Sequence, residues 1–419
     1  MRKIFYLAMV AVIAIFTGCA NDDDALLHDD SLLDDSQQDT SINVIPYVTF
    51  TATSEQAFTF TIPDEFTSAL GVNGYFEYSV GDGEWKRFTT TVDNILFGGF
   101  WGSLRLRGKS RMGTALYSGD GCSTIQFSTA NSPVDCTGDI RTLIDYENYA
   151  DVSTAYAGFR YLFYQNKALR TAPQLPAKTL ADLCYTGMFS GCTALTTAPE
   201  LPAETLAYGC YKGMFSGCTS LTTAPELPAK TLAKYCYTEM FDGCSALSTA
   251  PKLPAETLAS YCYYTMFRGC TSLTTAPELP AKTLANYCYS GMFSGCDSLT
   301  TAPELPAKTL ADGCYDRMFF RCTSLTTAPE LPAKTLAEYC YQLMFRGCTS
   351  LSSVTMLATN VRESKCLAFW LYEAGTNVQG KYPTLTLYNS DAYKKIMELQ
   401  NNGWNYLPDL WRNNIRYKY

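Results

Sequence analysis

The chain has 419 residues, a formal net charge of −8 and 18 cysteines. The negative charge is concentrated in residues 20–40, which carry eight Asp and no Lys or Arg, whereas residues 41–419 hold 30 basic and 32 acidic side chains and lack the basic excess typical of nucleic-acid binding. The only histidine, His28, lies in the acidic segment. Because no nucleophile elbow or phosphate loop is present either, the sequence argues against an enzyme, although an isolated pair of carboxylates would leave no sequence signature.

Residues 1–18 have the pattern of an export signal. Arg2 and Lys3 precede an apolar stretch, 4–16, that is too short to span a bilayer comfortably, and small residues lead to Cys19. The segment resembles a bacterial lipoprotein signal, although Phe16 departs from the usual leucine. The resemblance implies a lipid on the Cys19 sulfur and membrane attachment through that lipid only. An ordinary secretory signal followed by a chance cysteine is the alternative.

Residues 19–41 are predicted to form a flexible acidic tether, because their like charges repel one another. The run Asp22-Asp23-Asp24, directly after Cys19, resembles the surface-export signal of lipoproteins in Bacteroidetes-type bacteria. That resemblance implies a lipid-anchored protein of the outer membrane that faces the cell exterior. Any solvated linker has the same composition.

Residues 42–135 alternate between apolar and polar side chains and predict a small antiparallel β domain, most simply a sandwich. Gly81-Asp82-Gly83 separates two of the expected strands and indicates a hairpin. Cys122 and Cys136 are candidates for a disulfide across this domain. The expected strands are 47–52, 58–62, 75–80, 84–88, 103–107 and 124–128.

Residues 136–376 contain seven consecutive copies of a 26-residue unit, flanked by worn copies at 158–166 and 366–374. A fixed period of this length predicts a solenoid, in which each coil buries its apolar face against the next. Residues 377–419 are expected to form a closing cap with a strand at 384–388 and a helix near 392–399. The proline of the recurring Ala-Pro-x-Leu-Pro-Ala stands at Pro173, Pro199, Pro225, Pro251, Pro277, Pro303 and Pro329.

Within one unit, the sequence predicts a short helix and an extended segment. Leu180, Cys184, Met188 and Cys192 recur every four residues, as one stripe of a helix would, with Thr179 as its cap and Gly191 as its stop. Residues 195–201 would then be extended and parallel to their neighbours. The proline in this segment limits the sheet, because it has no N–H to donate.

Fourteen cysteines occupy two fixed places in the unit, with gaps of 8 and then 18 residues, as in Cys184, Cys192 and Cys210. Zinc modules use closer pairs and usually histidine, so no metal and no cofactor are expected. We interpret the cysteines as two columns of small buried side chains. Disulfides between neighbouring coils are the alternative, because coils spaced about 5 Å apart would allow them.

The pattern Met-Phe-x-Gly-Cys-x-x-Leu resembles the BspA-like, Treponema-type branch of leucine-rich repeats, over residues 158–376. The resemblance implies an α/β leucine-rich-repeat solenoid, with short parallel strands and short helices, preceded by the small antiparallel β domain. It also implies adhesion to host proteins or to the surface proteins of other bacteria. The 26-residue unit is longer than the family's usual one and has a less regular strand before its proline.

Two charged ladders and one tyrosine row are the candidate binding surfaces. The ladders are either a solvated face of compensating charges or an array that matches a repetitive ligand such as a fibrous protein or a glycan. Tyr235, Tyr261, Tyr287 and Tyr339 would either stack on sugar rings or shield the core, and Leu183, Gly209 and Gly313 interrupt them. The ladders are Glu200, Glu226, Lys252, Glu278, Glu304 and Glu330, and Lys178, Glu204, Lys230, Glu256, Lys282, Lys308 and Lys334.

Two further columns vary between copies and lie on the side of the expected helix and at its exit. They are Asp182, Tyr208, Lys234, Ser260, Asn286, Asp312 and Glu338, and Ser190, Ser216, Asp242, Arg268, Ser294, Phe320 and Arg346. Drift at solvated positions and selected binding variety both explain them. The favoured function is a non-catalytic surface lipoprotein that binds host or bacterial surface proteins through its repeats. A glycan-binding or scaffold lipoprotein of the outer envelope is the alternative, and an enzyme is the least supported.

Overall fold

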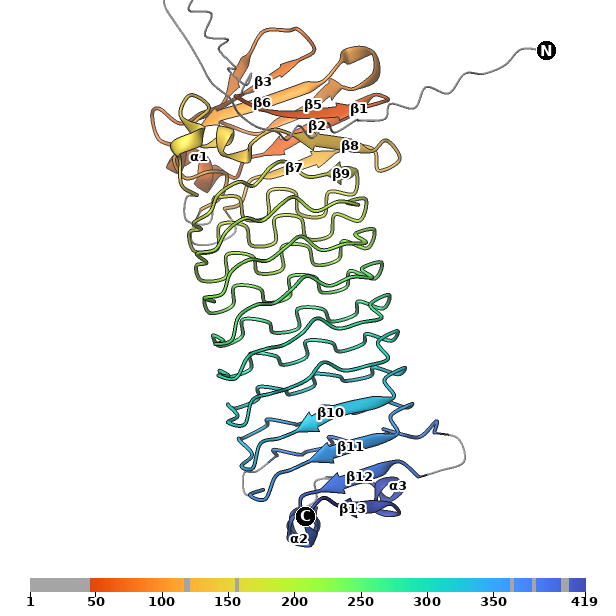
Figure 1. The fold of residues 1–419 in the computed structure, drawn as a ribbon. Helices are drawn as coiled ribbons and strands as arrows, with labels where there is room; N and C mark the ends of the chain where they lie inside the picture. Colours follow the sequence, from red (N-terminus) through yellow and green to blue (C-terminus); the bar gives the residue numbers. More distant parts are fainter. Residues whose placement is uncertain (1–45, 117–120, 155–157, 362–364, 379–381, 401–406) are drawn as a thin grey trace, which may run out of the picture. The chain divides into compact units, whose positions relative to one another are not determined.

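The computed structural model describes residues 46–116, 121–154, 158–361, 365–378, 382–400 and 407–419. The protein is mostly sheet with few helices, and residues 45–419 form one compact unit. Figure 1 shows two regions of sheet, one in the N-terminal part and one in the C-terminal part, joined by rows of backbone that repeat along the chain. Among the described residues, no helix is long and apolar enough to cross a bilayer.

The N-terminal part consists of two facing sheets, as the alternating pattern predicts. Their inner faces meet through phenylalanines: the ring centroids of Phe60 and Phe76 lie 5.0 Å apart, and those of Phe50 and Phe58 lie 6.1 Å apart. The six-stranded sheet has the order β4-β3-β6-β1-β8-β9, with β1 (Val48–Ala52), β3 (Tyr75–Val80), β4 (Lys86–Phe88), β6 (Leu104–Lys109), β8 (Val134–Thr137) and β9 (Leu169–Thr171). The three-stranded sheet has the order β5-β2-β7, with β2 (Gln56–Thr61), β5 (Val92–Phe97) and β7 (Thr124–Phe127).

The six expected strands are present, and β3 pairs with β4 as an antiparallel hairpin around Gly81. The sequence did not predict β5, β8 or the helix α1 (Asp64–Leu70). The strand β8 spans the expected domain boundary at residue 135 and pairs in parallel with β9, which directly follows the first worn copy, 158–166. The sheet therefore continues into the repeats. Three short 3-10 turns complete this part: η1 (Gly99–Trp101), η2 (Ile140–Leu143) and η3 (Tyr149–Asp151).

The expected helix of each unit is wrong. Residues 158–361 of the structure contain no helix, and the segment 183–192 instead forms consecutive four-residue turns. Every fourth residue has a positive φ, at Leu183 (57°), Gly187 (58°) and Gly191 (77°). Thr179 is not a helix cap but bridges to Thr205 of the next unit, and Gly191 continues the turns instead of ending a helix. We call residues 183–192 and their equivalents in the other units the turn ladder.

Hydrogen bonds in the turn ladder alternate along the backbone. The N–H groups of Leu183, Tyr185, Gly187, Phe189 and Gly191 donate to carbonyls of the next unit, for example from Phe189 to Met214 at 2.9 Å. The N–H groups between them donate three residues back, for example from Met188 to Tyr185 at 3.2 Å. Since the same pattern recurs from unit to unit, the backbone donors of the ladder are used inside it.

Two of every four side chains in the turn ladder point inward and form buried columns. The tyrosines from Tyr185 to Tyr341 stack face to face, with ring centroids 5.7 to 6.0 Å apart. The phenylalanines from Phe163 to Phe345 stack likewise, at 5.5 to 5.8 Å. The repeat cysteines are fully buried, as the sequence predicts. The core of the repeats is therefore a bundle of columns that run from unit to unit.

The extended segments of the units pair only at isolated bridges, such as Thr223 with Thr249 and Thr275 with Thr301. The two prolines of each Ala-Pro-x-Leu-Pro motif explain this, because they lack donors for a longer ladder. The expected limit on the sheet is therefore seen in most units, although bridges also join Thr179 to Thr205 and Thr257 to Thr283, outside the proline segment. Strands become continuous and parallel only at the C-terminal end, in the order β10 (Thr327–Leu331), β11 (Ser353–Met356), β12 (Thr384–Leu387) and β13 (Ile415–Tyr417).

The C-terminal segment contains the expected strand, β12, and the expected helix, α2 (Ser390–Gln400), followed by a short helix α3 (Asp409–Arg412). In β11 the prolines of the unit are replaced by Val354 and its neighbours, which can donate to both adjacent strands. Trp411 is fully buried, and its indole N–H donates to the Ala374 carbonyl at 3.0 Å. These contacts cover the last turn of the repeats.

A candidate binding groove on the turn ladder

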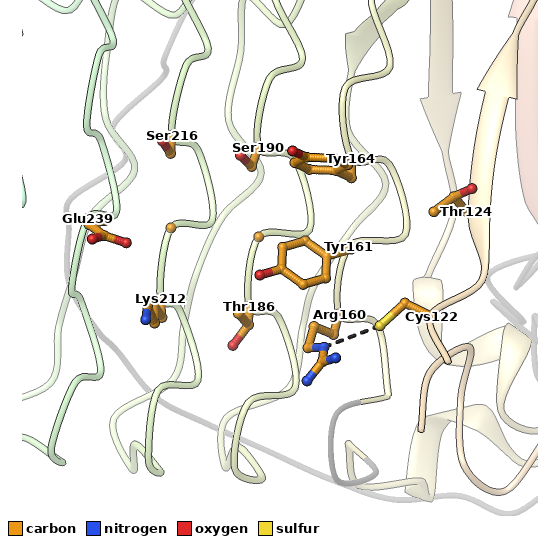
Figure 2. A pocket seen from close by; sticks show the side chains of 12 residues that line it. Cys122, Thr124, Arg160, Tyr161, Tyr164, Thr186, Ser190, Lys212, Ser216 and Glu239 are labelled. Atoms are coloured by element: carbon orange, nitrogen blue, oxygen red, sulfur yellow. Dashed lines mark hydrogen bonds between the residues drawn. The ribbon is translucent and has the colours of Figure 1, made fainter. Parts of the chain in front are cut away.

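A groove of about 580 Å³ lies on the outer side of the turn ladder, over the first units. Its lining comes from three successive units, from the first worn copy and from the β7 region, as Figure 2 shows. The lining residues are Cys122, Thr124, Arg160, Tyr161, Tyr164, Thr186, Gly187, Ser190, Lys212, Gly213, Ser216 and Glu239. This volume is in the range of binding sites for small molecules.

The groove exists because two consecutive units carry small residues at the same two columns. The column Tyr161, Gly187, Gly213 and Glu239 has no side chain at its two middle positions. In the neighbouring column, Ser190 and Ser216 follow Tyr164 and precede Asp242. The floor is consequently backbone and hydroxyl groups, and larger side chains rise at either end.

Gly187 and Gly213 both adopt the left-handed conformation, with φ of 58° and 59°. Their N–H groups donate to the carbonyls of Lys212 and Thr238, each at 2.8 Å. The space above Gly213 is open, because an added Cβ would meet no atom within 4 Å. Gly213 is therefore the position where a ligand can approach the backbone most closely.

Two tyrosines form one wall of the groove. The rings of Tyr161 and Tyr164 meet edge to face, with centroids 5.4 Å apart, and 39% of the Tyr164 surface is exposed. Burial raises the pKa of Tyr161, while the nearby Arg160 acts in the opposite direction, so the hydroxyl is neutral at pH 7. The Arg160 guanidinium in turn donates from Nε to the Cys122 sulfur at 3.2 Å.

The charges around the groove are mixed. Arg160 and Lys212 are basic, Glu239 is acidic, and the pair Asp242–Arg268 follows just beyond, with Nε of Arg268 2.8 Å from Oδ1 of Asp242. A mixed polar lining with an aromatic wall suits a neutral or zwitterionic polar ligand. The hydroxyl of Thr186, which also lines the groove, donates a hydrogen bond to the Gly209 carbonyl at 2.8 Å.

The two charged ladders lie on exposed parts of the extended side, as predicted, but away from this groove. All thirteen of their side chains are exposed. Lys230 and Glu256 border a separate hollow of about 610 Å³, together with Thr231 and Thr257, and Glu200 borders another, of about 450 Å³, among prolines. The ladder residues brought into direct contact with a partner are Glu330, 2.6 Å from Nζ of Lys418, and Lys334, whose ammonium lies 3.5 Å from the Tyr388 ring centroid.

The tyrosine row is packed against itself. The rings of Tyr235 and Tyr261 are stacked at 4.8 Å, and those of Tyr261 and Tyr287 at 5.1 Å. Tyr287 then covers Gly313, where an added Cβ would come within 2.3 Å of its ring. Because these faces contact each other or the backbone, they are not free to stack on a sugar ring.

The cysteines are free thiols throughout the described residues. In the second column, each sulfur donates to a phenylalanine carbonyl of the preceding unit, as Cys218 does to Phe189 at 3.1 Å and Cys322 does to Phe293 at 2.9 Å. Burial raises the pKa of these thiols, to about 12 for Cys210 and Cys244. No cluster of three or more His, Cys, Asp or Glu that could hold a metal occurs in the part that the structure describes. The lipidation candidate, Cys19, lies outside that part.

Sequence reasoning missed the groove but singled out part of it. Ser190 and Ser216 belong to one of the variable columns, whereas Arg160, Tyr161 and Tyr164 fall at the unassigned positions of the worn copy. The available signal was the coincidence of small residues, Gly187 with Ser190 and Gly213 with Ser216, in consecutive units. Comparison with known proteins adds no family to this geometry: no family model, curated protein or solved structure matches the chain.

Proposed function

We propose that the chain is a surface lipoprotein whose 26-residue units form a leucine-rich-repeat solenoid of the BspA-like kind, and that it acts as a non-catalytic interaction and adhesion module. The observation that carries this proposal is the groove over Gly187 and Gly213, which is walled by Tyr161, Tyr164 and Glu239. Its lining holds donors, acceptors and an aromatic edge, which are the features of a recognition surface. The parallel stacking of equivalent residues from unit to unit supports the solenoid.

The groove can be tested by removing its exposed wall. Tyr164→Ala and Lys212→Ala, in the full chain purified in detergent, are expected to weaken binding to the ligand at least tenfold, because both side chains line the groove. Tyr208→Ala is the matched control, since Tyr208 is also an exposed tyrosine, 45% accessible, but lies outside the groove. The measurement is surface plasmon resonance against a panel of host matrix proteins and a panel of glycans. Equal losses for all three variants would rule the groove out.

The same panels separate the two candidate functions. Binding confined to matrix or bacterial surface proteins supports adhesion, whereas binding confined to glycans supports the alternative of a glycan-binding or scaffold lipoprotein. A specific observation favours keeping that alternative: the floor of the groove offers hydroxyls at Ser190 and Ser216 and no apolar side chain. The triple variant E226K/E278K/E304K tests the charged ladder independently. Unchanged binding by this variant excludes that face.

The proposed location follows from the resemblance of residues 1–24 to surface-exported lipoprotein signals. Protease shaving of intact cells is expected to remove the repeats rapidly, and replacement of residues 20–40 by a neutral linker is expected to protect them. Protection of the unaltered chain until the outer membrane is broken would leave an envelope scaffold as the better account. Periplasmic location would contradict adhesion without contradicting ligand binding in the groove.

A further inference from the structure

One unit near the C-terminal end of the repeats carries arginine at two left-handed positions of the turn ladder, and at one of them every other complete copy has glycine. The third left-handed position of the ladder is glycine in six of the seven complete copies and arginine at Arg321, where φ is 58°. In the same unit, the second left-handed position is Arg317, with φ of 53°, where the preceding unit has Gly291. A side chain other than glycine is strained in this conformation. The second position also accepts Glu239, Thr265 and Leu343, so Arg321 is the more unusual of the two arginines.

Aromatic rings lie beside two arginines of this region, Arg321 and Arg346. The guanidinium carbon of Arg321 lies 5.3 Å from the ring centroid of Phe320, and that of Arg346 lies 5.9 Å from the same ring. Arg346 also lies 5.0 Å from the ring centroid of Tyr372, which continues the column formed by Phe320 and Arg346. Guanidinium groups packed on rings lose less freedom when they bind an anion, because their orientation is partly fixed beforehand.

The carboxylates near these arginines do not pair with all three of them. Arg317 is paired with Asp316, with Nη1 2.5 Å from Oδ2, and Arg346 approaches Glu373 only at 4.0 Å. Arg321 is exposed and has no carboxylate within 4 Å among the described residues. By contrast, Arg268, in the same column as Phe320 and Arg346, is held by two contacts with Asp242. Arg321 therefore differs from Arg268 and Arg317, each of which has a carboxylate partner.

The backbone around the cluster has no donors to offer. The N–H groups of Arg317, Phe319 and Arg321 donate to the next unit, and those of Met318, Phe320 and Cys322 donate within their own unit. A peptide strand cannot add to this surface, because strand addition needs free main-chain groups. A ligand must be recognised by the side chains alone, through anionic groups that guanidinium forks bind well.

We propose that Arg317, Arg321 and Arg346 form a binding site for an anionic polysaccharide that bears sulfate or carboxylate groups. Phe320 lies beside the guanidinium groups of Arg321 and Arg346, Tyr372 lies beside that of Arg346, and Asp316 is paired with Arg317. The site is separate from the groove at Tyr164 and Lys212, so either can fail without the other. The site would meet such a polymer on the cell exterior only if the proposed surface location is right. Binding by the purified chain does not depend on that location.

The test uses the full chain in detergent and immobilised heparin at low and physiological salt, with soluble hyaluronan as a carboxylate-only competitor. The double variant R317G/R321G restores the residue type that other copies use at these positions, and it is expected to weaken heparin binding at least tenfold. Its melting temperature is expected to be unchanged or higher, since the backbone strain is relieved. Weaker heparin binding with an unchanged or higher melting temperature would show that the variant has lost the binding site and has kept the fold.

Two controls keep the outcome specific. The variant K282S/K308S removes two exposed positive charges from the ladder on the extended side, so it matches the charge change and is expected to bind heparin within twofold of the unaltered chain. R268S removes the arginine that Asp242 already neutralises and is expected to behave in the same way. Equal binding by R317G/R321G and the unaltered chain would overturn the proposal, as would equal losses in the controls. Competition by poly-glutamate as strong as that by heparin oligosaccharides would overturn the ligand class.

Discussion

Tyr161 lies across Gly187, so closely that a Cβ added to the glycine would come within 2.1 Å of Cε1 of the ring. The contact joins the first worn copy to the first complete unit, and it fixes the aromatic wall of the groove. Gly213 occupies the equivalent place one unit later, with the same backbone conformation and open space above it.

Gly187→Ala is accordingly expected to displace Tyr161 and to destabilise the chain, whereas Gly213→Ala is the matched control for the effect of backbone strain on stability. Both substitutions place alanine in the left-handed region, at about 1–2 kcal/mol each. Gly187→Ala adds the steric conflict with the ring and is expected to lower the free energy of unfolding by at least about 1 kcal/mol more. Urea denaturation followed by fluorescence measures both. Equal effects of the two variants would show that the Tyr161 contact contributes nothing.

The stacked phenylalanine column is expected to carry much of the stability of the repeats. Phe241 is fully buried, and its ring centroid lies 5.6 Å from those of both Phe215 and Phe267. Phe241→Ala should reduce the free energy of unfolding by about 3–5 kcal/mol, and Phe241→Leu by less, since leucine fills part of the cavity. Chemical denaturation of the two variants checks this order. A loss below about 1 kcal/mol for alanine would contradict a packed column.

The thiols are expected to be unreactive in the folded chain and fully reactive after unfolding. Burial raises their pKa, and the thiolate is the reactive form. Titration with Ellman's reagent at pH 8 should therefore modify Cys122, the only partly exposed cysteine among the described residues, and in denaturant all seventeen cysteines that follow Cys19. A count near zero in denaturant without reductant would instead demonstrate disulfides between neighbouring units.

Asp316 is expected to make stability fall as pH rises from about 4 to about 6. Burial raises its pKa from 3.8 to about 6, against the opposing effect of Arg317. In this window the folded chain holds a proton that the unfolded chain has released, so the folded state is favoured at the acidic end. The advantage of the unaltered chain over Asp316→Asn should shrink by up to about 3 kcal/mol between pH 4 and pH 7.

The measurement for Asp316 is a pair of urea denaturation series, one for each chain, across that pH range. Other carboxylates titrate in both chains, so only the difference between the two curves reports Asp316. Parallel curves would mean that the carboxyl is solvated and not buried.

The sequence predicted the strands of the N-terminal part because they alternate cleanly, as Phe58 and Phe60 do on one face of β2. It predicted the buried cysteine columns because a strict period repeats the same environment. It could not distinguish a helix from four-residue turns, since the spacing of Leu180, Cys184, Met188 and Cys192 fits both. Glycines at Gly187 and Gly191, four residues apart inside the apolar pattern, are the signal that favours turns.

The groove and the arginine cluster were harder to foresee, because neither belongs to one copy of the unit. The groove forms only when Tyr164, Ser190 and Ser216 become neighbours. The sequence gives the number of units, but not how the backbone of one unit pairs with that of the next. Arg321 and Arg346 likewise come from two different units, and both guanidinium groups lie near the ring of Phe320. Sequence variation between copies shows where such sites can arise, and the stacking of units decides which residues meet.

The alternation of donors makes the turn ladder tolerant of the gain or loss of whole units and intolerant of a single residue inserted within it. Gain or loss of a whole unit leaves each outward N–H opposite a carbonyl of its neighbour, whereas a single inserted residue exchanges the outward donors with the local ones. The interval between the groove and the arginine cluster can therefore change only in whole steps. Adding or removing one unit would therefore change the distance between the groove and the arginine cluster by a fixed amount and leave the residues of each unchanged.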